Sequence, residues 1–188
     1  GDLCRKHDCL LLLDTVTSLG GVPLYIDDWK VDLAYSCSQK GLSCPPGLGP
    51  FTMGPRAEAK MEARTGKVPN WYLDVSLLNK YWGSDRVYHH TAPVNMNFGM
   101  REALRLLAEE GLDQAWARHR RNAEALWSGM ESLGLTMHVP YERRLPTLTT
   151  VRIPDGVDGK AFSQYLLNTH GIEVGGGLGS LSGKIWRI

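Results

Sequence analysis

The first forty residues contain apolar runs that end in polar residues, as the buried strands of a parallel sheet do. Residues 9–13 form a continuous apolar run that stops at Asp14, and residues 31–37 form a second run that leads to Lys40. An uninterrupted apolar run is typical of a strand covered on both faces. Asp14 and Lys40 are therefore expected just past strand ends, at the edge where open α/β sheets bind ligands.

Turn residues and helical periodicity indicate the next elements. Glycines and a proline surround a short strand predicted at residues 22–26, between the two apolar runs. A probable edge strand near residues 51–53 precedes a short helix that begins at Pro55. Pro93 is expected to open a longer helix with one apolar face, which ends at Gly111.

The strongest periodic pattern lies in the last third of the chain. Apolar residues recur at steps of four and three over residues 112–133, which predicts one amphipathic helix. His119 lies on this stripe, where a lone histidine is more often packed than catalytic. Asp158 can cap a further helix. Short strands are expected at residues 147–153, 172–174 and 184–188.

The change from long apolar runs to short mixed elements suggests two parts. Residues 1–110 are expected to form an α/β region with a mostly parallel sheet flanked by helices, and residues 111–188 a smaller α+β domain. The glycine cluster at residues 175–179 is predicted to be a loop. It lacks the Lys-Ser/Thr pair of a phosphate-binding P-loop, and its permissive backbone would let another segment approach closely.

Composition narrows the classes of function. Lys and Arg total 21 against 20 Asp and Glu, without a basic run, so we expect no nucleic-acid or membrane partner. The longest apolar run, residues 9–13, is too short to span a bilayer. The four cysteines are spaced unlike a zinc site, and we interpret them as buried reduced thiols. The start at Gly1, without Met or a leader, suggests a fragment.

Asp14 and Lys40 have an ordinary interpretation beside a functional one. They stand 26 positions apart (40 minus 14) at the same predicted sheet edge. They could form a simple ion pair, which contributes only about 0–1 kcal/mol when exposed. Spacing alone favours this interpretation over an active site.

Four sequence strings, taken together in order and spacing, change that balance. They are residues 10–21, Ser-Gln-Lys at 38–40, Tyr-His-His-Thr at 88–91 and Gly-Gly-Leu-Gly at 176–179. The set resembles the alanine-glyoxylate and serine-pyruvate aminotransferases, which are class-V aminotransferases of fold type I among pyridoxal-phosphate enzymes. The resemblance implies the C-terminal half of the cofactor-binding large domain over residues 1–110, and a truncated small domain after it.

The resemblance assigns the central roles to three residues. Lys40 would bond to the aldehyde of pyridoxal 5'-phosphate, and once displaced by substrate would move a proton at the substrate Cα. Asp14 would keep the ring nitrogen protonated, so that the ring acts as an electron sink. Val16 would pack against one ring face as a stiff β-branched wall.

Further residues would bind the phosphate and the substrate. Gln39 is expected near the phosphate, while Tyr88 and Thr91 would reach the phosphate of a neighbouring subunit, which implies a homodimer with shared sites. Arg187 would bind the substrate α-carboxylate, because a guanidinium meets both oxygens at once. Other arginines, Arg143, Arg144 and Arg152, compete on composition alone and are expected to be solvated. His89 and His90 are assigned no catalytic role.

The implied reaction is transamination of alanine or serine with glyoxylate or pyruvate. Alternatives within the fold are 3-hydroxykynurenine or serine-glyoxylate transamination, and a non-catalytic fragment that only pairs with an intact subunit is the alternative from another class. The sequence departs from the family at Cys37, at Ser180 and in a shortened approach over residues 85–87. The phosphate loop and the stacking aromatic would lie outside these residues, so we expect the fragment alone to be inactive. Relatives suggest a peroxisomal or mitochondrial location.

Overall fold

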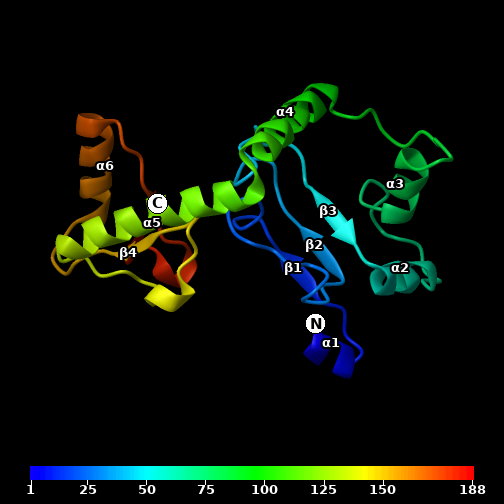
Figure 1. Cartoon of the computed structure of the whole chain (residues 1–188), viewed down its shortest axis with the longest axis horizontal. Coiled ribbons are helices and arrows are strands. Elements are labelled where there is room, and N and C mark those ends of the chain that lie inside the picture. The colour runs from blue at the N-terminus through cyan, green and yellow to red at the C-terminus, as the bar shows by residue number, and fades with distance from the viewer. The chain divides into compact units, whose positions relative to one another are not determined.

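The computed structural model describes residues 1–188, which divide into two units (Figure 1). The first comprises Gly1–Val16 and Tyr25–Arg105, and the second comprises Thr17–Leu24 and Leu106–Ile188. The division therefore falls five residues before the end of the region predicted as 1–110, and a short early segment joins the second unit. That the two regions are a cofactor-binding domain and a small domain stays a prediction.

A three-stranded sheet forms the centre of the first unit. Its strands are β1 (Leu12–Asp14), β2 (Leu33–Tyr35) and β3 (Phe51–Met53), in the order β1-β2-β3. β1 and β2 are parallel, and β3 is antiparallel to β2, as Figure 1 shows. The predicted strands at the two apolar runs and at residues 51–53 are thus confirmed, although each is only three residues long.

Two expectations for this region were wrong. Residues 22–25 form an irregular segment rather than a strand, because Pro23 has no N–H for a ladder, and Ile26 begins a turn that the Val31 N–H closes on its carbonyl at 3.0 Å. The first strand is also not covered on both faces, since Leu12 is 55% exposed.

The helices of the first unit begin at local sequence signals. Pro55 occupies the first turn of α2, where its missing N–H costs nothing, and Asp74 caps α3 by accepting from the Ser76 N–H at 3.0 Å. The helix expected after Pro93 is confirmed, because α4 begins at Val94 and ends at Glu110, next to Gly111. The helices are α1 (Asp2–Lys6), α2 (Pro55–Glu62), α3 (Val75–Trp82) and α4 (Val94–Glu110), of which α4 continues into the second unit.

A buried carboxylate ties these elements together. Asp32, just before β2, accepts from the Arg56 guanidinium through both oxygens at 3.1 and 3.0 Å. The same carboxylate accepts from the Leu11 N–H at 2.8 Å, and Arg56 also donates to the Cys9 carbonyl at 3.2 Å. The buried charge is therefore paired and fully bonded, which is the condition under which burial of a carboxylate is tolerated.

The second unit combines helices with an antiparallel sheet. The sheet order is β4-β6-β5. The capped helix at Asp158 is confirmed, because its side chain accepts from the N–H groups of Lys160 and Ala161 at 3.0 Å each. The elements are α5 (Leu112–Ser132), η1 (Tyr141–Arg143), β4 (Thr150–Arg152), α6 (Gly159–His170), β5 (Gly175–Gly176), η2 (Gly179–Leu181) and β6 (Ile185–Arg187).

The glycine cluster was partly misassigned. Its first two residues form β5, which pairs with β6, and the strand expected at residues 172–174 is absent. The predicted close approach is confirmed at Gly177, where an added Cβ would collide with the Leu181 carbonyl. A glycine is needed there because another stretch of backbone occupies the space of a side chain.

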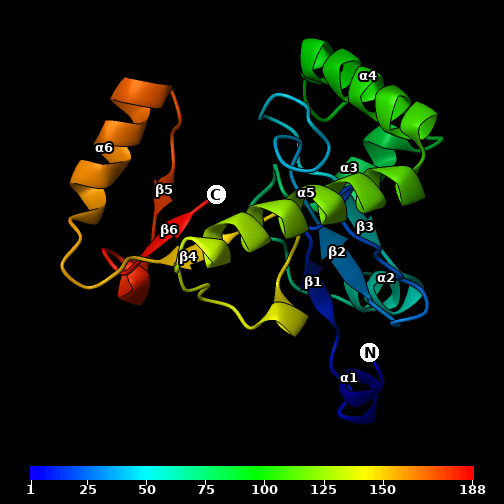
Figure 2. The same cartoon turned by 60° about the vertical axis from the view of Figure 1, so that its left-hand side comes forward.

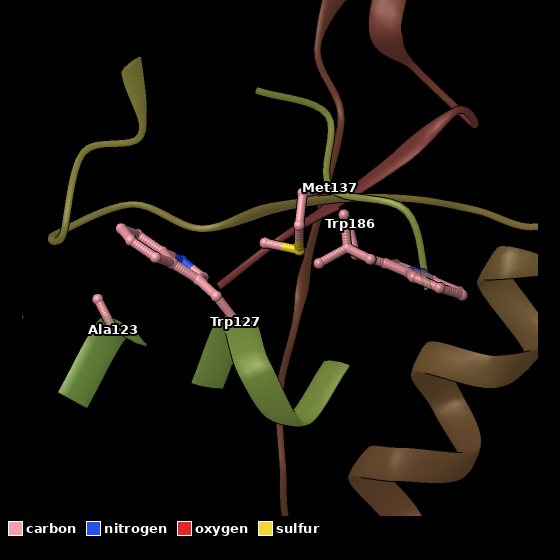
Figure 3. Packing of buried hydrophobic residues seen from close by; sticks show 5 residues of the cluster. Ala123, Trp127, Met137 and Trp186 are labelled. Atoms are coloured by element: carbon pink, nitrogen blue, oxygen red, sulfur yellow. The ribbon is translucent and has the colours of Figure 1, made fainter. Parts of the chain in front are cut away.

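Large aromatic side chains form the core of the second unit. Trp127 from α5 is 1% exposed, and its indole N–H donates to the Thr149 hydroxyl at 2.8 Å. Figure 3 shows Met137 between the indole rings of Trp127 and Trp186. Trp186 also holds α6 against the sheet, since its indole N–H donates to the Gly159 carbonyl at 3.1 Å. The path of the chain from α6 through β5 to β6 can be followed in Figure 2.

Candidate active site

Asp14 ends β1 with both carboxylate oxygens hydrogen bonded. Its parallel partner in register is Tyr35, whose hydroxyl donates to Asp14 Oδ2 at 2.6 Å. The Val16 N–H donates to Asp14 Oδ1 at 2.9 Å. The Tyr35 hydrogen bond, then that from Val16, lowers the pKa of the exposed Asp14 carboxyl, and the same contact raises the pKa of Tyr35. Asp14 is thus an oriented anion at the carboxyl end of the strand.

Lys40 lies in a turn that a buried serine fixes. Ser38 is fully buried, and its hydroxyl donates to the Pro45 carbonyl at 2.7 Å and accepts from the Leu48 N–H at 3.3 Å. The Ser43 N–H closes the turn on the Lys40 carbonyl at 2.8 Å. The Lys40 side chain is exposed. A rigid turn therefore presents an accessible amine.

The turn that holds Lys40 and the Asp14 residue lie at the same edge of the sheet. Pairing continues past the two strands, because the Thr15 N–H donates to the Tyr35 carbonyl at 2.9 Å and the Ser36 hydroxyl donates to the Thr15 carbonyl at 3.0 Å. The chain contains no ion pair between Asp14 and Lys40. The simple ion-pair interpretation is therefore wrong in this structure.

Gln39 and Val16 flank these two groups. Gln39 is exposed beside Lys40, and Val16 is half-buried two residues after Asp14. Val16 also supplies the backbone N–H that binds the aspartate. Their expected contacts with phosphate and ring face stay predictions.

The segment with Tyr88 and Thr91 is held by a histidine pair. The Tyr88 and Thr91 hydroxyls lie 3.0 Å apart, and Tyr88 is 71% exposed. His89 is buried, stacks on Trp71 with 4.0 Å between ring centroids, and lies with Nε2 3.1 Å from the Trp71 carbonyl. Because a carbonyl only accepts, His89 Nε2 carries the hydrogen. In the neutral pair, His90 Nδ1 then donates to His89 Nδ1 across 2.8 Å.

Arg187 lies on β6 in the second unit with part of its guanidinium already bound. Its Nε donates to the Gly176 carbonyl at 2.6 Å. A Cβ on Gly175 would come only into ordinary van der Waals contact with Arg187 Nη2, at 3.5 Å. The two Nη groups make no hydrogen bond within the chain, and a planar pair of donors suits a carboxylate.

The competing arginines behave differently from one another. Arg143 and Arg152 are exposed, as expected. Arg144 is not solvated: its side chain is 10% exposed, it donates to Glu131 at 2.6 Å, and its guanidinium lies 5.3 Å from the Trp127 ring. The expectation failed for Arg144 because it packs against the aromatic core through a cation–π contact.

The cysteines are unpaired, as expected, but only one of them is buried. Cys44 is buried, Cys4 and Cys37 are half-buried, and Cys9 is exposed. The prediction of buried thiols is wrong for Cys9, because it falls before β1 begins.

None of the helices is long and apolar enough to cross a membrane.

Tyr35 is the residue of this site that sequence reasoning missed. Tyrosine inside an apolar run is read as strand material. Only the register that sets Tyr35 opposite Asp14 brings its hydroxyl to the carboxylate. If the apolar runs at residues 9–13 and 31–37 had been aligned as parallel neighbouring strands with their polar ends at one edge, the alignment could have indicated the pair of Asp14 and Tyr35.

An amine and an oriented carboxylate lie at the carboxyl edge of an α/β sheet, which is the edge where open α/β sheets bind ligands. The family model "Aminotransferase class-V" matches residues 1–185. The chain therefore belongs to the class-V aminotransferase family. The predicted family and α/β fold are confirmed.

Individual relatives agree with this assignment. The chain is 45% identical to the alanine–glyoxylate aminotransferase of Callithrix jacchus, over 100% of the chain and 46% of the relative. It is 37% identical to the (S)-ureidoglycine–glyoxylate transaminase of Bacillus subtilis, over 100% of the chain and 50% of the relative. The crystal structure of an alanine–glyoxylate aminotransferase from Nostoc sp. superposes with a TM-score of 0.96 at 65% identity, over 99% of the chain and 49% of that structure. The chain spans about half the length of the relatives it matches.

Proposed function

We propose that the protein containing this chain transfers an amino group from a small amino acid, alanine or serine, to glyoxylate or pyruvate, with pyridoxal phosphate as cofactor. The relatives named as alanine–glyoxylate aminotransferases support the substrate pair. The ureidoglycine relative shares glyoxylate in its name but differs in the donor. Glyoxylate is therefore the better supported half of the proposal, and alanine is the first donor to test.

The cofactor assignment rests on the chemistry of the amine and the carboxylate at the edge of the sheet. An aldehyde needs a primary amine, and Lys40 presents one on a fixed turn. A protonated ring nitrogen needs an acceptor, and Asp14 presents a carboxylate whose pKa is lowered by Tyr35 and Val16. The residues present therefore fit the aldehyde and the ring nitrogen of pyridoxal phosphate. When bound, the cofactor supplies an electron sink for negative charge at the substrate Cα.

The chain's own residues would divide the work of the reaction. Lys40 would hold the aldehyde carbon until the substrate amine displaces it. Its free amine would then move the proton from the substrate Cα to the former aldehyde carbon. Asp14 would remain an anion against the ring nitrogen. Arg187 would orient the substrate through its two Nη groups, which the chain itself leaves unbonded.

Phosphate binding is proposed to involve two subunits of a homodimer. Gln39 would donate from the subunit that holds Lys40. Tyr88 and Thr91 would donate from the neighbouring subunit, and their hydroxyls already lie 3.0 Å apart on an exposed segment. Two hydroxyls at this separation can both reach one phosphate group.

Replacement of Lys40 tests this function most directly. In the full-length protein, Lys40→Ala should lower the alanine-dependent conversion of glyoxylate to glycine by about 10²–10⁴-fold or more, the range for loss of a positioned acid–base group. Lys67→Ala, which removes another exposed amine, is the matched control and should keep full activity.

Chemical trapping gives an independent measurement. Borohydride reduction of the protein with bound pyridoxal phosphate, followed by peptide mapping, should attach the cofactor to Lys40. A label on another lysine, or a Lys40→Ala protein as active as the control, would contradict the proposal.

A further inference from the structure

The Asp14 carboxylate is fixed by two donors, one to each of its oxygens. One oxygen accepts from the Val16 N–H at 2.9 Å, in a local turn of its own strand end. The other accepts from the Tyr35 hydroxyl at 2.6 Å, from the neighbouring strand. The local bond is available to an aspartate in many turns. The bond from Tyr35 depends on the fold, because the two residues are 21 positions apart.

The position of Tyr35 is itself set by backbone contacts. Tyr35 and Asp14 are register partners on parallel strands, so their side chains project from the same face of the sheet. The Tyr35 carbonyl accepts from both the N–H and the hydroxyl of Thr15, at 2.9 and 2.7 Å. Thr15 is buried. The tyrosine ring therefore stands on a backbone that is bonded twice to the residue next to Asp14.

We propose that Tyr35 is a positioning residue that fixes the Asp14 carboxylate for contact with the ring nitrogen of pyridoxal phosphate. The inference rests on the proposed function, because it concerns how Asp14 meets the cofactor. Tyr35 acts through Asp14 and is assigned no contact with the cofactor.

The acceptor capacity of the carboxylate permits this arrangement. An ionised carboxylate offers about four lone-pair sites on its two oxygens. Tyr35 and Val16 occupy one site on each oxygen, so acceptor sites remain for a ring N–H. The terminal torsion of an aspartate is broad and two-fold, so that without the Tyr35 hydroxyl only the Val16 N–H would restrict it.

The charge of the site supports the same role. The Tyr35 hydrogen bond is the main cause of the lowered pKa of Asp14. A hydrogen bond to the charged form of an acid favours that form, so Tyr35 helps to keep Asp14 an acceptor when a protonated ring nitrogen faces it.

Tyr35→Phe removes the hydroxyl and keeps the ring. In the cofactor-free protein, a ¹³C NMR titration of the Asp14 side chain should show its midpoint shifted upward in this variant. In the full-length protein, the Kd for pyridoxal phosphate should rise by about tenfold, the effect of one hydrogen bond to a charged group. Tyr25→Phe is the matched control, since Tyr25 is also an exposed tyrosine of the first unit and its hydroxyl makes no hydrogen bond within the chain.

A double-mutant cycle separates positioning from a general structural effect. In an Asp14→Asn background, Tyr35→Phe should change cofactor affinity by less than about twofold, because the partner through which it acts has been altered. An equal loss of affinity in both backgrounds, or an unchanged Kd in Tyr35→Phe, would overturn the proposal.

Failure of the proposed function gives a different result. A wild-type protein that binds no pyridoxal phosphate would contradict the function, whereas the Asp14 titration would still show whether Tyr35 holds the carboxylate.

Discussion

The two units of this chain hold their interiors together by different means. Apart from Leu42, the buried residues of the first unit are small or polar, and the polar ones, Thr15, Asp32, Ser36, Ser38 and His89, each form hydrogen bonds to backbone or side chains. The second unit buries two tryptophans together with Met137. The first unit thus depends on directional bonds, and the second on apolar packing.

This difference matches the distribution of chemistry along the chain. Hydrogen bonds fix a group in one orientation, whereas apolar packing is not directional. The unit with buried polar groups is the one that presents Asp14 at a strand end and Lys40 on a fixed turn. Several of its large apolar side chains lie at the surface, among them Leu12, Phe51, Trp71, Trp82 and Tyr88. Orientation of the proposed site residues is therefore achieved without a large local core.

The largest expected effect is loss of the aromatic core. Trp127→Ala should lower the free energy of unfolding by about 3–5 kcal/mol, the usual cost of truncating a buried tryptophan. The change also leaves the Thr149 hydroxyl without its indole partner. Urea unfolding followed by far-UV circular dichroism measures the effect.

An exposed tryptophan of the first unit is the matched control for this variant. Trp82 is 62% exposed, so Trp82→Ala should change stability by no more than about 0.5 kcal/mol. Equal losses in the two variants would show that apolar packing does not distinguish the units.

A smaller effect is expected from the polar interior. Ser38→Ala removes the hydroxyl that donates to the Pro45 carbonyl and accepts from the Leu48 N–H. We expect a loss of about 1–2 kcal/mol, because buried partners are left unsatisfied. Hydrogen exchange should accelerate at the Ser43 and Cys44 amides, which close the Lys40 turn.

Ser128→Ala serves as the comparison, because Ser128 is exposed on α5 and its hydroxyl makes no hydrogen bond within the chain. Exchange in the Lys40 turn should be unaltered in this variant. If Ser38→Ala left the turn equally protected, the polar interior would not be what fixes the site.

The same contrast explains what the sequence could predict. Apolar periodicity indicated α5, and Pro55, Pro93 and Asp158 marked helix starts correctly, because these signals act over a few neighbouring residues. The strand expected at residues 22–26 is absent, because local apolar content cannot tell a strand from an irregular segment without a partner strand.

The candidate site was predicted unevenly for the same reason. The polar positions Asp14 and Lys40 follow directly from the ends of the apolar runs. Tyr35 was missed, because its bond to Asp14 depends on strand register, and Arg144 was misjudged, because its burial depends on tertiary packing with Trp127. The roles of Gln39, Tyr88, Thr91 and Arg187 came from resemblance and stay predictions.

The smallest expected effect concerns a titrating group on the packed helix of the second unit. Burial, then the neighbouring Arg118, lowers the pKa of His119, while Glu110 opposes the shift. The unfolded chain should therefore bind a proton near pH 6.5, while the folded protein keeps His119 neutral to lower pH. The stability that neutral His119 contributes is present above pH 6.5 and is lost as pH falls through the lower pKa of the folded state.

Urea unfolding at pH 7.5, 6.5 and 5.5 should show this decline in stability. His119→Gln should reduce the decline, whereas His7→Gln, at an exposed histidine, should leave it unchanged. A decline of the same size in all three proteins would mean that His119 is not the packed, neutral group that distinguishes this interior from the polar one.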